Sequence, residues 1–227
     1  MRLIAISDTH GMHHEVELPP YQKGDILIHA GDITRKGEIA TVANFGNWLK
    51  SLPYEHNIVI AGNHDFSFQD ERRIHVEGIL KSAGATYLLD ESVTIDGVKF
   101  YGSPWQPWFH SWAFNLHRGP EIARKWRMIP DDTDVLITHG PPSNNNGGLI
   151  QEVISGAVHE REVGCSNLLD RIRELRNLQY HIFGHIHECH GVYQDQTASC
   201  KFVNASVLNI KYECVNEPFI LGILPKP

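Results

Sequence analysis

The 227-residue sequence has no long hydrophobic run, which bears on where the protein can reside. No segment approaches the ~18 consecutive apolar residues of a transmembrane helix, so we expect no membrane partner. The apolar start of the chain is interrupted at Asp8, and it does not have the pattern of a secretory signal peptide. The four cysteines show no CxxC spacing and no disulfide framework. We therefore expect a cytoplasmic protein.

The sequence also lacks clusters of basic residues. Its formal net charge is -7, and Lys and Arg are scattered rather than grouped. A protein that wraps a long nucleic acid needs many cationic side chains to neutralise phosphates, so we expect no such partner. A small phosphate substrate is compatible with this charge, because bound divalent cations would reverse the local field.

Short apolar segments alternate with amphipathic segments, and no repeat or low-complexity linker divides the chain. This alternation predicts an α/β fold in a single domain over residues 1–227. The Asp96-Gly97 pair predicts a hairpin turn, and Ser166 is the expected N-cap of the last helix. The predicted helices are Ile39–Ser51, Glu71–Ala83, Pro120–Trp126 and Ser166–Asn177. The predicted strands are Leu3–Ser7, Ile26–His29, Ile58–Ala61, Thr86–Leu88, Val98–Gly102, Val135–Thr138, Tyr180–Phe183, Lys201–Asn204 and Phe219–Leu224.

Five of the predicted strands are followed by polar side chains that can bind metal ions, each beside a glycine. Ligands of open α/β sheets bind at the carboxyl ends of strands, so these side chains are expected to converge. Residues two apart in an extended segment point to one side, which would place Asp8 with His10 and His185 with His187. The five strings are DTHG from Asp8, GD at Asp32, GNHD from Gly62, HG from His139 and GHIH from Gly184.

The chemistry of these side chains indicates a metal centre. Asp and Asn supply oxygen donors and His supplies nitrogen donors, a set that suits Mn²⁺, Fe, Zn²⁺ or Co²⁺. One carboxylate, such as that of Asp32, can bridge two ions. Each pair alone could arise by chance, and GD and GN are also common in turns. The recurrence at five strand ends is what favours a site.

In their order along the chain, these strings resemble the calcineurin-like metallophosphoesterase superfamily over residues 8–187. The strings HAGDIT, GSPWQP, THGPP and FGHIHE are similar to the metallophosphoesterase-domain-containing proteins within it, a subgroup associated with phosphodiesterase activity, cyclic nucleotides included. The resemblance implies two packed mixed β-sheets flanked by helices. It also implies two divalent metal ions, with Mn²⁺ as the first choice and Fe, Zn²⁺ or Co²⁺ as alternatives.

The resemblance also implies a role for each matching residue. His64 would not bind metal but would face the phosphate and act as the general acid for the leaving group. The implied ligands are Asp8, His10 and His187 for the first ion, Asn63, His139 and His185 for the second, and Asp32 as the bridge.

One position departs from the family pattern. The protein-phosphatase branch has an aspartate three residues after the GD aspartate, and that aspartate orients the catalytic histidine. Arg35 occupies this position here. Asp65 is the nearest acidic candidate to orient His64, and the alternative is that Asp65 ties down its own loop.

The expected function is hydrolysis of small phosphodiesters by a hydroxide that bridges two metal ions. The alternatives are a phosphomonoesterase or a nuclease with the same site, or a non-catalytic scaffold that binds metal. The aromatic residues of Trp105–Phe109, with Trp112 and Phe114, either wall a substrate pocket or pack into the core. Asn144–Asn146 either line the entrance or form a solvated loop. A homodimer is compatible with the exposed apolar strands.

Overall fold

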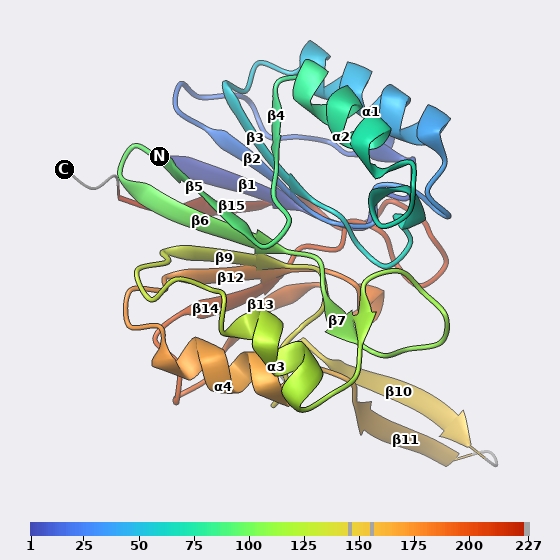
Figure 1. Ribbon diagram of the computed structural model, residues 1–227, viewed down its shortest axis with the longest axis vertical. Helices are drawn as coiled ribbons and strands as arrows, with labels where there is room; N and C mark the ends of the chain where they lie inside the picture. Colours follow the sequence, from blue (N-terminus) through green and yellow to red (C-terminus); the bar gives the residue numbers. More distant parts are fainter. Residues whose placement is uncertain (145–146, 155–156, 225–227) are drawn as a thin grey trace.

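The computed structural model describes residues 1–144, 147–154 and 157–224. Two β-sheets pack face to face, and a pair of helices covers the outer face of each sheet (Figure 1). The first sheet has the strand order β15-β1-β2-β3-β4, and the second has the order β13-β14-β12-β9-β6-β5. This arrangement confirms the α/β fold with two packed mixed sheets.

The first sheet has four parallel strands and one antiparallel edge strand, β15. Alternate residues of a strand face opposite sides of the sheet. Ile4 and Ile6 therefore pack under the helices, while Leu3 faces the second sheet. The elements of this layer are β1 (Arg2–Ile6), β2 (Ile26–Ala30), β3 (His56–Ile60), β4 (Ala85–Tyr87), β15 (Phe219–Gly222), α1 (Ile39–Ser51) and α2 (Arg73–Ser82).

The second sheet has four parallel strands with an antiparallel strand at each edge. Asp96 and Gly97 form the predicted hairpin turn, and both have positive φ (47° and 76°), as a type I′ turn requires. The elements of this layer are β5 (Glu91–Ile95), β6 (Val98–Ser103), β9 (Val135–Thr138), β12 (Tyr180–Phe183), β13 (Gly191–Gln194), β14 (Lys201–Asn204), α3 (Pro120–Trp126) and α4 (Ser166–Glu174).

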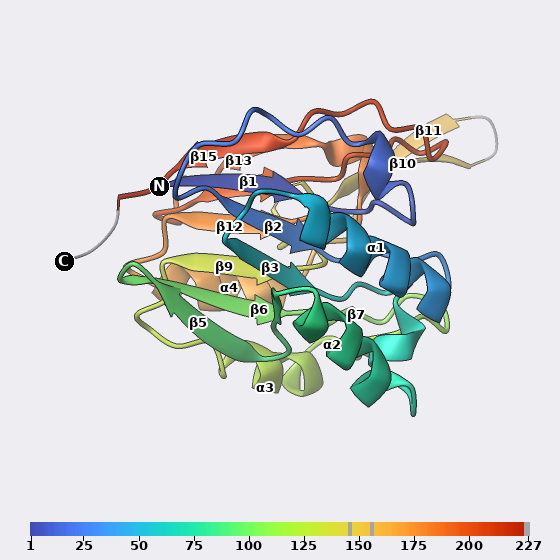
Figure 2. The same ribbon diagram turned by 90° about the horizontal axis from the view of Figure 1, so that it is seen from above.

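The parallel strands of both sheets point toward the same end of the molecule (Figures 1 and 2). Two small pairs of strands lie at that end. They are β7 (Gln106–Pro107) with β8 (Asn115–Leu116), and the projecting hairpin of β10 (Leu149–Ile154) and β11 (Ala157–Glu162). Among the described residues, short 3₁₀ turns also lie at His13–Glu15, Phe66–Phe68 and His187–Cys189.

Several predicted details differ from the structure. Helix α2 begins at Arg73, two residues later than expected, and Cys165 rather than Ser166 occupies the N-cap of α4, without a side-chain cap. Asn144 donates a hydrogen bond to Asp195 (2.7 Å), while Asn145 and Asn146 lie outside the described residues. In the part of the chain that the structure describes, no helix is long and apolar enough to cross a membrane.

Candidate metal centre

All seven predicted ligands lie in loops that directly follow strands, at the end toward which both sheets point. The loops follow β1, β2, β3, β9 and β12. Potential ligand atoms lie within 4.8 Å of one another in three overlapping groups: Asp8, His10 and His187; Asp8, Asp32 and His139; and His10, Asp32 and His64. The remaining two residues adjoin these groups, because Asn63 Oδ1 lies 2.8 Å from His139 Nε2 and the His185 ring lies 5.0 Å from the His139 ring.

The backbone at this centre is left-handed at four of the proposed ligands. Asp8, His10, Asp32 and His185 have φ values of 55°, 44°, 57° and 70°. Asn, Asp and His enter this region more readily than other non-glycine residues, and such positions cluster at functional sites. The extended geometry that the sequence suggested for Asp8–His10 and His185–His187 is therefore wrong. These side chains meet because each loop turns sharply at its ligands.

Glycine next to these residues lets the loops approach each other. A Cβ at Gly184 would overlap the Asp8 carboxylate and the Ser7 hydroxyl, and a Cβ at Gly62 would overlap Asp32. Only glycine fits at these two positions without displacing a carboxylate. The close approach brings the loop after β12, in the second sheet, against the loop after β1, in the first.

The two central carboxylates are held as ionised hydrogen-bond acceptors. Asp8 accepts hydrogen bonds from the His185 amide (3.0 and 3.1 Å) and the Ser206 hydroxyl (2.6 Å). Asp32 accepts one from the His64 amide (2.8 Å). Burial would raise the pKa of both carboxyls, but nearby histidines outweigh it and hold each pKa below its usual range.

Three of the histidines are oriented by the main chain in the same way. Nδ1 of His10, His139 and His187 lies 3.0 Å from the carbonyl oxygen of Thr34, Ala30 and Asn209 respectively. A carbonyl can only accept, so each Nδ1 carries a proton and each Nε2 is directed at the centre. Metal-binding histidines are commonly oriented through their other ring nitrogen in this manner.

The distances between the histidine Nε2 atoms and the carboxylates leave room for metal ions, and Nε2 of His139 also lies 2.8 Å from Asn63 Oδ1. Nε2 of His139, His187 and His10 lies 3.4, 3.5 and 3.7 Å from an Asp32 or Asp8 oxygen. Two ligands that each lie about 2.1 Å from one ion are about 3.0–3.4 Å apart, so the His139 distance lies within this range and the other two lie slightly above it. His10 Nε2 is also buried without a hydrogen-bond partner. The Asp8 and Asp32 carboxylates and the three histidine rings are therefore suited to binding metal cations between them.

The raised pKa values of two histidines also indicate a site that attracts cations. Burial opposes the charge on His139 and His187, but Asp32 and Asp8 respectively outweigh it and raise the pKa of each to about 9. A positive charge at Nε2 is thus stabilised by the carboxylates, and a metal ion there would compete with the proton.

His64 lies beside the centre in a fixed orientation. Its Nδ1 donates to the Arg35 carbonyl (2.7 Å), and its Nε2 faces Asp32 Oδ2 at 3.9 Å. The Trp112 ring lies against it, with centroids 4.1 Å apart at 31°. The orienting partner of His64 is therefore a main-chain carbonyl, which any residue at position 35 supplies.

Asp65 ties down loops and does not touch His64 through its side chain. Its buried carboxylate accepts hydrogen bonds from the amides of Ile33, Thr34 and Gly62 and from the Thr34 hydroxyl, at 2.7–3.1 Å. Burial, reinforced by the charge of Asp32, raises the pKa of Asp65 to about 6. Of the two roles considered for Asp65, the contacts support the structural one.

The sequence analysis missed two residues of the C-terminal segment. The Ser206 hydroxyl binds Asp8, and the Tyr212 ring lies against those of His10 and His187, with centroids 4.9 and 5.3 Å apart. The strand-end reasoning used for the other loops could have found Ser206, since it follows β14 by two residues. No local pattern pointed to Tyr212.

The aromatic segment divides between the two roles considered for it. Trp112 and Phe109 line a cavity of about 360 Å³ at the centre, together with His64 and Tyr212. Trp105 packs against the core and donates to Asp90 (2.9 Å). Phe114 is buried.

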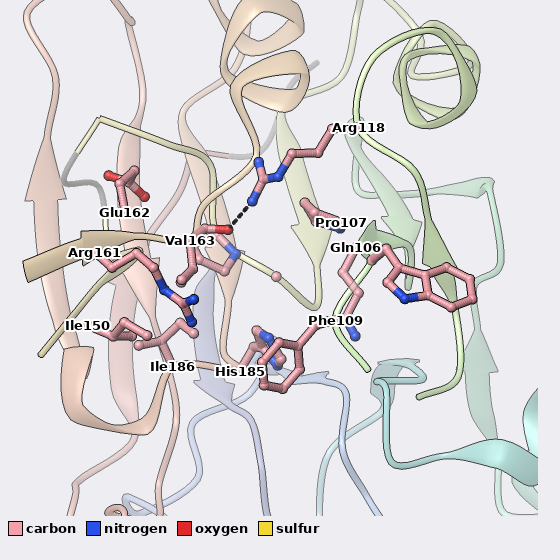
Figure 3. Close-up of a pocket in the computed structure, with 13 residues that line it drawn as sticks. Gln106, Pro107, Phe109, Arg118, Ile150, Arg161, Glu162, Val163, His185 and Ile186 are labelled. Carbon is pink, nitrogen blue, oxygen red and sulfur yellow. Dashed lines mark hydrogen bonds between the residues drawn. The ribbon is translucent and has the colours of Figure 1, made fainter. Parts of the chain in front are cut away.

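A second cavity, of about 430 Å³, adjoins the first. Gln106, Pro107 and Phe109 lie on one side of it, Ile150 and Arg161 lie on the other, and His185 lies at its base (Figure 3).

Comparison with known proteins agrees with this geometry. The family model described as calcineurin-like phosphoesterase matches residues 1–189. The chain belongs to this family. It is therefore a metal-dependent phosphoesterase, and the family implies divalent metal ions at the cluster of Asp and His residues.

This phosphoesterase has close relatives over its whole length. It is 40% identical to metallophosphoesterase domain-containing protein 1 of Homo sapiens, over 100% of this chain and 72% of that protein. It is 37% identical to a UPF0046 protein of Caenorhabditis elegans, over 98% and 81%. The crystal structure of TT1561 of Thermus thermophilus shares the fold, with a TM-score of 0.59 at 12% identity over 89% of this chain and 88% of that one.

Proposed function

We propose that this phosphoesterase hydrolyses small phosphodiesters, with cyclic nucleotides among the candidate substrates, at a centre of two divalent metal ions. Mn²⁺ is our first choice of metal. The convergence of the proposed ligands on Asp32 supports the binuclear assignment. The proposed ligands are Asp8, His10 and His187 for one ion, Asn63, His139 and His185 for the other, and Asp32 for both.

Two ions held there supply Lewis-acid activation of water and of the phosphoryl group. The chain itself fixes the geometry around them. The Thr34, Ala30 and Asn209 carbonyls hold three histidine rings, and the His185 amide and Ser206 hydroxyl hold Asp8. Preorganised ligands of this kind need not rearrange during the reaction.

In this proposal His64 is the residue that moves a proton. Its Nδ1 is occupied by the Arg35 carbonyl, so Nε2 is the atom that can donate to the leaving oxygen. Trp112 packs on the ring and limits its rotation. A positioned general acid of this type contributes about 10²- to 10⁴-fold to the rate.

The proposed preference for diesters rests on the charge of the cavity wall. Among the described residues that line the cavity at the centre, none is Lys or Arg, and Glu188 adds a negative charge. A phosphodiester bears one negative charge, whereas a monoester bears close to two at neutral pH. With no Lys or Arg among the described residues of this wall, the second charge of a monoester would be balanced only by the metal ions, the histidines and Arg35, whose guanidinium lies 5.5 Å from the Tyr212 ring.

The test compares bis(p-nitrophenyl) phosphate with p-nitrophenyl phosphate, using protein loaded with Mn²⁺. The diester should have the higher kcat/KM, and cyclic nucleotides in the same assay would identify the natural class. A preference for the monoester would overturn the proposal. No turnover of either ester by fully loaded protein would favour the scaffold alternative.

The bridging role of Asp32 has a separate test. Asp32→Asn should lose nearly all activity and bind less metal, because the amide offers only one oxygen donor. Asp170→Asn, on the exposed face of α4, is a matched control that should behave as wild type. Substantial activity of Asp32→Asn with both ions still bound would exclude Asp32 as the bridge.

A further inference from the structure

The second cavity lies between the β7 segment and the base of the β10–β11 hairpin (Figure 3). It meets the cavity at the metal centre at two residues, Phe109 and His185, which line both. A group attached to a phosphate at the centre could therefore extend past the His185 ring into this space. Its volume of about 430 Å³ is within the range of small-molecule sites.

The walls of this cavity are mainly apolar. Pro107, Pro141, Ile150, Val163 and Ile186 contribute aliphatic surface. At its rim Trp108 and Phe109 are 55% and 42% exposed. Exposed aromatic side chains that gather at a cavity commonly mark a binding site.

The charged residues Arg118, Arg161 and Glu162 line this cavity, and each contacts the protein itself; Glu162 accepts a hydrogen bond from the Gly164 amide (2.8 Å). Arg118 donates to the carbonyls of Val163 and Gly164 (both 2.7 Å), and Arg161 pairs with Glu152 (2.7 Å). These contacts hold the base of the hairpin in place. The remaining surface of the cavity is therefore better suited to an apolar or aromatic group than to a second phosphate.

The position of His64 determines which ester group can occupy the second cavity. His64 lines the cavity at the metal centre but not the second cavity. The leaving oxygen must lie beside His64, so the group on that oxygen stays in the first cavity. The other ester group, which remains bonded to phosphorus, is free to point toward His185.

We infer that the second cavity binds the retained ester group of the substrate and selects an apolar one, aromatic or branched alkyl. This inference rests on the proposed diesterase function. A monoester has no second ester group and would leave this cavity empty.

The experiment uses alkyl p-nitrophenyl phosphates, which share one leaving group and differ only in the retained ester. With Mn²⁺-loaded enzyme, kcat/KM for the benzyl ester should exceed that for the methyl ester by about 10- to 100-fold. The n-butyl ester should exceed the 2-methoxyethyl ester of similar size, because a buried ether oxygen would lose its hydrogen bonds to water. Each rate is normalised to the uncatalysed hydrolysis of the same ester.

The variant Ile150→Trp places an indole in the cavity and should lower the benzyl-to-methyl ratio to near 1. The ratio is measured within one preparation, so partial loss of folded enzyme does not alter it. Val158→Trp, at a 63% exposed position on the same hairpin, is the matched control and should keep the wild-type ratio.

Two results would overturn the inference while leaving the diesterase proposal intact. One is a wild-type benzyl-to-methyl ratio near 1, and the other is a high ratio that Ile150→Trp leaves unchanged. Absence of turnover for every ester would overturn the proposed function, and the inference with it.

Discussion

Replacing Asp65 tests whether this buried carboxylate supports the site or takes part in the chemistry. Asp65 joins the loop after β2 to the loop after β3, through the amides of Ile33, Thr34 and Gly62. Those loops carry Asp32, Asn63 and His64. We expect Asp65→Ala to lower the free energy of unfolding and to weaken metal binding, because both loops lose a common anchor.

The magnitude follows from the hydrogen bonds lost. Three backbone amides would remain without an acceptor, at about 1–3 kcal/mol each. Water entering the vacated space would recover part of this loss, since the carboxylate leaves room near polar groups. The pKa of Asp65, raised to about 6 by burial, shows that the fold does not favour its charge, so the cost comes from the orphaned amides. The expected net loss is about 3–5 kcal/mol, a large share of a typical stability.

Urea unfolding measures this change as a lower midpoint at an unchanged slope. Metal content and kcat are measured on the same preparations. Asp65→Asn is the companion variant and should lose less stability, because its amide oxygen can still accept one or two of the hydrogen bonds. A variant with wild-type stability and metal content but a kcat lowered more than 100-fold would refute the structural role and assign Asp65 to the reaction.

Three further predictions use other parts of the molecule. His64→Ala should keep its metal while kcat falls about 10²- to 10⁴-fold, and loss of metal in elemental analysis would show instead that His64 is a ligand. Gly184→Ala should bind metal poorly because its Cβ overlaps the Asp8 carboxylate, whereas Gly78→Ala in helix α2, where a Cβ meets nothing within 4 Å, should raise stability by up to about 1 kcal/mol. Burial lowers the pKa of His181 from 6.5 to about 3, so its contribution to stability is complete above pH 6.5 and is lost as the pH falls. The free energy of unfolding, measured in urea, should therefore fall less from pH 7 to pH 4 in His181→Leu than in wild type, by about 3 kcal/mol, and equal pH dependence would contradict this.

The sequence predicted the bounds of those elements that have a strong local sequence pattern. Helices α1 and α3 have the bounds predicted for them, because their apolar residues recur at helical spacing and Pro120 is suited to the first turn. The β10–β11 hairpin was not predicted. The side chains of β11 from Val158 to Glu162 are all exposed, so this part of the strand shows no alternation of buried and exposed positions that a sequence pattern could reveal.

The sequence predicted those parts of the candidate site that depend on the type of side chain. The proposed ligands have suitable donor atoms and follow strands, so their convergence could be predicted from the sequence. The partner of His64 could not be found in this way, because every residue carries the carbonyl that Arg35 contributes. Tyr212 was missed for another reason. It reaches His10 through the path of the chain after β14, which no local pattern encodes.

The carbonyl anchors of His10, His139 and His187 have a consequence for how this site withstands mutation. Each anchor belongs to the main chain at Thr34, Ala30 or Asn209, and substitution of those side chains leaves the carbonyl in place. Substitutions at these three positions should therefore leave the proton on Nδ1 of each ring. The centre then depends on the ligands themselves and on the residues that fix the path of their loops, such as Asp65 and Gly184.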